Sequence, residues 1–126
     1  ELQTRFTAGG RALQVSGFYQ PNNPEMVYLE SGTAPIELLS VMAHEYTHAW
    51  QSRNCTTQDR AVSEGFACWV QYKYLVQKGE NARAMSLTQH QDPDYGASLV
   101  KILEKERQLG AKGVVEWAKK AKNFNK

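Results

Sequence analysis

The stretch His44-Glu45-Tyr46-Thr47-His48 decides how this chain is interpreted, because two histidines stand four residues apart with a glutamate directly after the first. Positions four apart lie on the same face of an α-helix, so both imidazoles can reach a single cation. Glu45 then lies about 100° further round the helix, beside that cation. A zinc hydrolase needs this arrangement: two neutral nitrogen ligands and a carboxylate that can take a proton from water.

The residues around the two histidines predict a long helix from Thr33 to about Arg53. Apolar residues recur there at spacings of three and four, as on the buried face of an amphipathic helix. Thr33 can cap the helix, Pro35 suits its first turn, and Glu37 lies near the positive end of the helix dipole. The two histidines therefore lie in the middle of a helix, where their spacing has geometric meaning.

A third ligand is needed, because catalytic zinc sites generally have three protein ligands and leave a fourth position for water. Glu64 is the best candidate: it follows His48 by sixteen residues and lies near the start of a second predicted helix, 60–78, capped by Asp59. A short reversal between antiparallel helices would bring Glu64 back beside the histidines. Without the histidines, it would be an ordinary glutamate that favours the helix dipole. Gly65 removes a side chain where helices must approach closely.

The remaining patterns predict a small sheet and two further helices. Alternating residues at 11–20 and a short run at 26–30 predict two strands, which we expect to pair in an antiparallel sheet. Helices are expected at 96–109, ended by Gly110, and at 114–122, with one helical turn near 82–87. We therefore expect an α+β fold, in which a small N-terminal twisted sheet packs on two antiparallel metal-binding helices and two C-terminal helices close the core.

Composition places the chain, residues 1–126, among ordinary single globular domains, with 41% hydrophobic and 22% charged residues. A formal net charge of +2 with scattered basic residues argues against a nucleic-acid partner. No apolar run reaches the roughly 18 residues that a membrane span requires. Cys55 and Cys68 cannot build a disulfide framework, and whether they pair with each other stays open. Because the chain starts at Glu1 with neither Met nor a signal sequence, we expect a cut-out domain or a mature form.

The predicted ligand set implies a mechanism with one Zn²⁺ per chain. The ion would lower the pKa of a water molecule to about 7, and Glu45 would accept the proton of that water and later deliver it to the leaving amine. The developing oxyanion needs a further donor, for which the chain offers Tyr95 and His90, although either could be an ordinary loop residue. A site of two histidines and one carboxylate also suits non-haem iron, but the glutamate after the first histidine favours zinc.

Two other features could serve this site. The strand at 26–30 could add an extended peptide substrate to an exposed sheet edge, or it could be an ordinary covered strand. Partners for the Nδ1 hydrogens of the imidazoles should exist, and Asp59 and Asp94 are candidates.

The stretches 42–50 (MAHEYTHAW) and 63–68 (SEGFAC) resemble the gluzincin-type peptidase domain of the plant organ-growth regulators and of their bacterial relatives. The plant proteins are LIM-domain metallopeptidases that ubiquitin activates. The stretch 92–96 (DPDYG) is similar to a segment that follows in that domain. The resemblance covers roughly residues 11–120. The resemblance implies a zincin-like fold. It also implies that His44, His48 and Glu64 are zinc ligands and that Glu45 is the catalytic residue.

This chain departs from the plant proteins in what it lacks. It has no cysteine-rich LIM module and no acidic ubiquitin-interacting helix, so activation by ubiquitin is not implied. We expect a zinc metallopeptidase of the gluzincin type, an endopeptidase that acts on a peptide or protein substrate, with partner domains or an activator left open. The alternative is a zinc-containing binding or regulatory module with little peptidase activity. A third interpretation is a helical domain without metal, in which the histidines bond to backbone groups.

Overall fold

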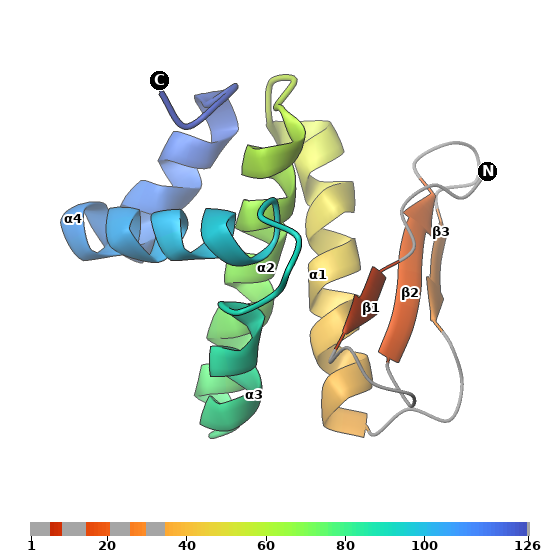
Figure 1. Cartoon of the computed structure of the whole chain (residues 1–126). Coiled ribbons are helices and arrows are strands. Elements are labelled where there is room, and N and C mark those ends of the chain that lie inside the picture. Colours follow the sequence, from red (N-terminus) through yellow and green to blue (C-terminus); the bar gives the residue numbers. More distant parts are fainter. Residues whose placement is uncertain (1–5, 9–14, 21–25, 30–34, 126) are drawn as a thin grey trace.

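The computed structural model describes residues 6–8, 15–20, 26–29 and 35–125. Most of the described chain is helical, and Figure 1 shows how the helices are arranged. The four helices are α1 (Pro35–Asn54), α2 (Arg60–Gln77), α3 (Asn81–Leu87) and α4 (Gly96–Lys120).

Helices α1 and α2 form where the sequence predicts them, because their signals are local. The side chain of Asp59 accepts a hydrogen bond from Val62 N at 2.9 Å and so caps α2, as predicted. Beyond its last turn, Gly79 has φ 78°, a left-handed conformation that glycine adopts without steric cost. The predicted cap of α1, Thr33, lies outside the described residues.

Helix α4 combines the two helices that were predicted at 96–109 and 114–122. Its residue Gly110 is not helical, with φ 77° and ψ 168°, so the axis bends sharply there. The prediction that Gly110 interrupts the helix is confirmed, but the chain resumes its helix at once. The second arm of α4 therefore turns back toward the loop between α1 and α2 (Figure 1).

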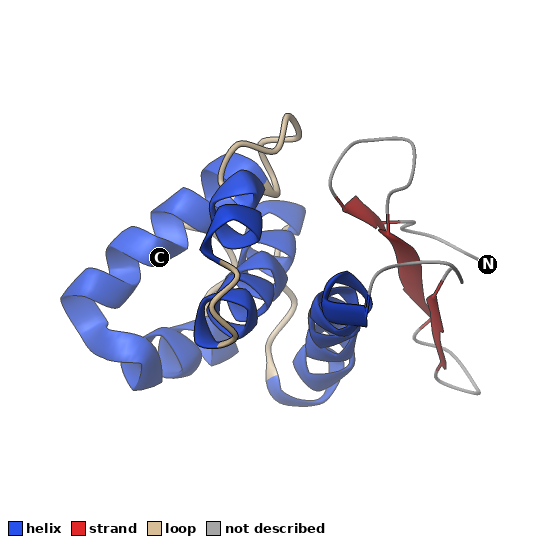
Figure 2. Ribbon diagram, turned by 90° about the horizontal axis from the view of Figure 1, so that it is seen from below, coloured by secondary structure: helices blue, strands red, loops and turns tan. Residues whose placement is uncertain are grey.

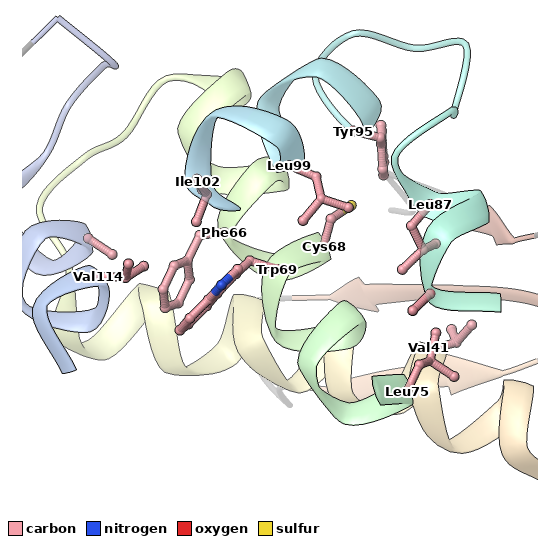
Figure 3. Close-up of a cluster of buried hydrophobic side chains, with 12 residues drawn as sticks. Val41, Phe66, Cys68, Trp69, Leu75, Leu87, Tyr95, Leu99, Ile102 and Val114 are labelled. Atoms are coloured by element: carbon pink, nitrogen blue, oxygen red, sulfur yellow. The ribbon is translucent and has the colours of Figure 1, made fainter. Parts of the chain in front are cut away.

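The hydrophobic core of the described residues lies between the four helices (Figure 3). A methyl group at Gly65 would lie only 2.7 Å from Ser98 Cβ, so this glycine permits α2 and α4 to approach closely. The core consists of twelve side chains from all four helices and the residue before α4: Val41, Phe66, Cys68, Trp69, Leu75, Ala84, Leu87, Tyr95, Leu99, Ile102, Val114 and Ala118.

A polar contact also joins α2 to α4. Trp69 Nε1 donates to Glu106 Oε1 at 2.9 Å, and Lys73 forms an ion pair with the same carboxylate. Partial burial alone would raise the pKa of Glu106, but the hydrogen bonds from Lys73 and Trp69 outweigh it and hold the pKa below its ordinary value.

Three short strands form an antiparallel sheet in the order β1-β2-β3: β1 (Phe6–Ala8), β2 (Val15–Gln20) and β3 (Met26–Leu29). The predicted strands at 11–20 and 26–30 are thus confirmed within the described residues, and their antiparallel pairing is confirmed as well. Residues 11–14 and Glu30 lie outside the described part. Figures 1 and 2 show the sheet on the side of α1 that faces away from α2.

The predicted α+β fold class is wrong, because the architecture of the described chain is helical. The strands have three, six and four residues, whereas α1, α2 and α4 have 20, 18 and 25. Every member of the described hydrophobic core lies in a helix or directly before one. The sequence pattern showed that strands form, but it overestimated their share of the structure.

Two further expectations concern the membrane and the cysteines. Among the described residues, no helix is both long enough and apolar enough to span a bilayer. Cys55 and Cys68 are both free thiols, which settles the question that the sequence left open. Cys68 lies in the core, and burial, together with the nearby carboxylates of Glu64 and Glu45, raises the pKa of its thiol.

Candidate metal centre

Helices α1 and α2 lie side by side and run in opposite directions, which brings the three predicted ligands together (Figure 1). Glu64 Oε1 lies 3.1 Å from Nε2 of His44 and 3.1 Å from Nε2 of His48. The three candidate ligand atoms all lie within 4.8 Å of one another. His44 is 1% exposed and Glu64 is 6% exposed, whereas the side chain of His48 is 13% exposed, so the cluster is largely buried and reaches solvent at His48.

The first imidazole is held by an amide side chain. His44 Nδ1 lies 3.0 Å from Gln71 Oε1, and Gln71 Nε2 donates to Ser40 Oγ at 3.2 Å. The hydroxyl of Ser40 already donates its hydrogen to Glu37 O at 2.9 Å, so it can only accept from Gln71. The amide group therefore faces Ser40 with its nitrogen and His44 with its oxygen, and His44 carries a hydrogen on Nδ1.

The second imidazole is held in the same way. His48 Nδ1 lies 2.7 Å from Gln51 Oε1, and Gln51 Nε2 donates to the backbone oxygen of Ser63 at 3.0 Å. A backbone oxygen only accepts, so the nitrogen of Gln51 faces Ser63 and its oxygen faces His48. His48 therefore also carries its hydrogen on Nδ1.

These orientations direct the Nε2 atoms of both imidazoles toward the carboxylate of Glu64. When both imidazoles are neutral and protonated on Nδ1, each presents the lone pair of Nε2 to the ionised carboxylate of Glu64. Three acceptor atoms then face one another in a buried place, which is unfavourable unless a cation lies between them. The 3.1 Å separations are close to the roughly 3.3 Å between two ligand atoms of a tetrahedral zinc site with bonds of about 2.0–2.1 Å. The donor set therefore fits a zinc ion.

The pKa values describe the metal-free cluster, in which a proton can take the place of the cation between the imidazoles and Glu64. Burial alone would raise the pKa of Glu64, but contacts with imidazoles that also carry a hydrogen on Nε2, at His44 and His48, outweigh burial and hold that pKa well below its ordinary value. Burial dominates at His44 and lowers its pKa, although Glu64 opposes the shift. Burial also opposes protonation of His48, but its contacts with Glu64 prevail and raise its pKa. A positive charge between the imidazoles and the carboxylate therefore stabilises the cluster.

Glu45 lies beside the ligands on α1 and is 1% exposed. Burial raises its pKa to about 7, with His48 opposing the shift and Glu64 adding to it. Among the residues that the structure describes, no hydrogen-bond donor is found for its carboxylate. A buried carboxylate without such a partner is costly, and groups of this kind are common at functional sites.

The two candidate oxyanion donors differ in how close they come to the ligands. Tyr95 is buried at the start of α4, and its ring stacks on that of His44 with centroids 5.9 Å apart and planes at 9°. His90 stacks on Tyr95 at 4.9 Å, and its Nδ1 accepts a hydrogen bond from the backbone nitrogen of Asp92. The guanidinium of Arg60 lies 5.4 Å from the centre of the Tyr95 ring. The structure thus places Tyr95 against a candidate ligand and His90 one ring further away.

The sequence did not identify the two glutamines that orient the imidazoles. Asp59, which it suggested for this role, caps α2, and Asp94 forms an ion pair with an arginine at the start of α2. A usable signal was present, because each glutamine shares a helix face with a ligand: Gln51 follows the second histidine by three residues, and Gln71 follows the glutamate by seven.

Comparison of the chain with models of protein families, with curated proteins and with solved structures finds no match. The likeness to the gluzincin peptidases therefore remains a resemblance carried by short motifs, and the chemistry of the site has to be inferred from its own residues.

Proposed function

We propose that this chain is a zinc-dependent peptidase, with one Zn²⁺ held by His44, His48 and Glu64. The observation that carries the proposal is the convergence of three largely buried ligand atoms, two of them on imidazoles whose orientation is fixed by amide side chains. Buried acceptors that face one another are costly without a cation. Two imidazole nitrogens and one carboxylate oxygen are a common ligand set of catalytic zinc, which keeps a fourth position for water or substrate.

When bound, zinc supplies a Lewis acid that polarises a peptide carbonyl and lowers the pKa of water. Glu45 accepts a proton from the attacking water and returns it to the leaving amine nitrogen. Its place on the helix supports this role, because it directly follows His44 and therefore lies about 100° further round the helix than that ligand. For the oxyanion we favour Tyr95 over His90, since the Tyr95 ring contacts a ligand directly.

A sheet edge supports a peptide as the substrate. In the three-stranded sheet, β3 is an outer strand, and among the described residues it pairs only with β2. Strands β2 and β3 both lie next to α1, the helix that carries two ligands and Glu45. An extended peptide can add to such an edge through main-chain hydrogen bonds. This arrangement favours peptide or protein substrates over small molecules.

The proposal is tested by metal analysis and by peptide cleavage of the parent chain and Glu45→Gln. We expect about one equivalent of zinc in both proteins, and a loss of cleavage of about 100-fold or more in the variant. Glu104→Gln, the same chemical change on an exposed part of α4, is the matched control and should cleave like the parent.

Three outcomes would count against the proposal. Less than about a tenth of an equivalent of zinc after careful loading would refute the metal site, given the tight affinity of such sites. Full activity of Glu45→Gln would refute the role of that carboxylate. A zinc-loaded parent that cleaves no peptide of a broad library, yet binds a specific partner, would favour a binding module instead.

A further inference from the structure

The loop between α1 and α2 connects the second histidine to the far end of α4 through side-chain hydrogen bonds. Gln51, which accepts from His48 Nδ1, donates from Nε2 to Gln58 Oε1 at 3.3 Å. Gln58 in turn donates from its own Nε2 to the backbone oxygen of Ala118 at 2.6 Å. We propose that Gln58 is a positioning residue of the metal centre, which acts on His48 through Gln51. This inference rests on the proposed function.

The direction of each hydrogen bond in the series is fixed from its far end. The backbone oxygen of Ala118 only accepts, so Gln58 must face it with its amide nitrogen and must face Gln51 with its amide oxygen. Gln51 then meets two acceptors, Gln58 Oε1 and the backbone oxygen of Ser63, and must turn its nitrogen toward both. Its oxygen is left for His48 Nδ1. Gln58 thus stabilises the orientation of Gln51 that a zinc ligand at His48 requires.

The C-terminal end of α4 is well suited to accept the hydrogen bond from Gln58. Ala118 belongs to the last turn of the helix, where backbone oxygens lack a partner within the helix and carry partial negative charge. Two further bonds dock this end onto the same loop: Thr56 N donates to Lys119 O at 3.0 Å, and Asp59 N donates to Lys122 O at 2.8 Å. The helix end is therefore held in place independently of Gln58.

Burial makes the series effective. Gln51 is buried, Ala118 is fully buried, and Gln58 is half-buried, so water competes poorly for these bonds. Successive hydrogen bonds polarise one another, and the series ends at the negative pole of a helix. Both effects place more electron density on Nε2 of His48 and strengthen it as a ligand.

The test measures zinc affinity by competition with a chromophoric chelator for the parent, Gln58→Met and the control Gln77→Met. Gln77 is an exposed residue of the last turn of α2. Removing a direct partner of a ligand costs about 10- to 100-fold in metal affinity, and Gln58 is one step further away. We therefore expect about 3- to 10-fold weaker binding in Gln58→Met and no change in Gln77→Met.

A double-mutant cycle separates positioning from a general loss of structure. If Gln58 acts through Gln51, the Gln58→Met effect on zinc affinity disappears in a Gln51→Leu background. The visible spectrum of the cobalt-loaded protein gives a second readout, because it reports the geometry at the metal. We expect Gln58→Met to change this spectrum and Gln77→Met to leave it as in the parent.

The outcomes distinguish this inference from the proposed function. A parent chain that binds no zinc overturns both. A parent that binds zinc, with equal affinity and an equal cobalt spectrum in Gln58→Met, overturns the role of Gln58 alone. A Gln58→Met effect that persists at full size in the Gln51→Leu background also overturns it, since the effect would then not pass through Gln51.

Discussion

We expect Glu64→Gln to remove zinc binding and yet to stabilise the metal-free protein. In the parent, Glu64 Oε1 lies 3.1 Å from Nε2 of both His44 and His48. A neutral imidazole with its hydrogen on Nδ1 presents only a lone pair at Nε2, so the two Nε2 atoms and the carboxylate oxygen are then all acceptors. A glutamine would place two N–H donors at this point, one for each imidazole. A neutral hydrogen bond contributes about 0.5–1.5 kcal/mol, so the free energy of unfolding should rise by about 1–3 kcal/mol.

The assay is thermal unfolding at a pH of about 8.5, two units above the ordinary pKa of histidine, with chelator and with zinc. For a domain of this size, 1 kcal/mol shifts Tm by about 3–5 °C, so the variant in chelator should melt about 3–15 °C above the parent. Zinc at about 100 times its Kd stabilises the parent by about 2.7 kcal/mol and should raise its Tm by about 8–14 °C. Glu64→Gln should not respond to zinc.

The exposed substitution Glu104→Gln is the control, and it should respond to zinc and to chelator as the parent does. A Glu64→Gln variant that melts below the parent in chelator would refute the reasoning. It would mean that the carboxylate makes stabilising contacts of its own in the metal-free cluster.

Three further predictions concern the surroundings of the site and the packing of the helices. Gln71→Leu removes the acceptor of the Nδ1 hydrogen of His44, and we expect zinc affinity to fall by about 10- to 100-fold in a chelator competition. Gly65→Ala would bring a methyl group to 2.7 Å from Ser98 Cβ, so we expect urea unfolding to show a loss of about 1–3 kcal/mol. The hydrogen bonds from α2 outweigh burial and hold the pKa of Glu106 below its ordinary value of 4.5. The parent should therefore be more stable than Glu106→Gln above about pH 4.5, and this advantage should disappear as the pH falls through the pKa of the folded state. The difference in free energy of unfolding between parent and Glu106→Gln, measured from neutral to acid pH, should therefore shrink below about pH 4.5.

Each of these predictions has an outcome that contradicts it. Unchanged zinc affinity in Gln71→Leu would mean that packing alone orients the imidazole. An unchanged urea midpoint in Gly65→Ala would mean that α4 moves away at little cost. A stability difference that stays constant with pH would show that the Glu106 carboxylate gains nothing from its partners in the folded state.

Local signals made α1 and α2 predictable. The apolar spacing, the cap at Asp59 and the glycine stop at Gly79 act within one or two helical turns, so tertiary contacts did not change them. The fold class was not predictable in this way. Alternation along a strand shows that its residues can pair, but it does not show how much of the core they build, and here the described core is helical. The sequence correctly marked an interruption of the helix at Gly110. The direction that α4 takes after Gly110 depends on the contacts of its last turn with the loop between α1 and α2.

In the candidate site, too, the features set by local sequence were predictable and those set by distant contacts were not. The spacing of His44 and His48 is a property of a single helix, and the position of Glu64 required only that two neighbouring helices run antiparallel. The roles of Gln51 and Gln71 depend on which way each amide points, and that follows from acceptors elsewhere in the fold. The spacing of these glutamines from the ligands was a signal that they share a helix face, but amide side chains are common on helices, so spacing alone does not assign their roles.

The bend at Gly110 has a consequence for the order of folding. Residues 35–77 contain both helices of the candidate site, and their contacts are short in sequence, so this hairpin can form early. The contact between Gln58 and Ala118 joins positions 60 residues apart, and it exists only after the second arm of α4 has folded back. Closing such a distant contact carries a larger entropy cost, which places it late in folding. The hairpin would thus gather the ligands first, and the arrival of the chain's last helical arm would then fix the orientation of His48.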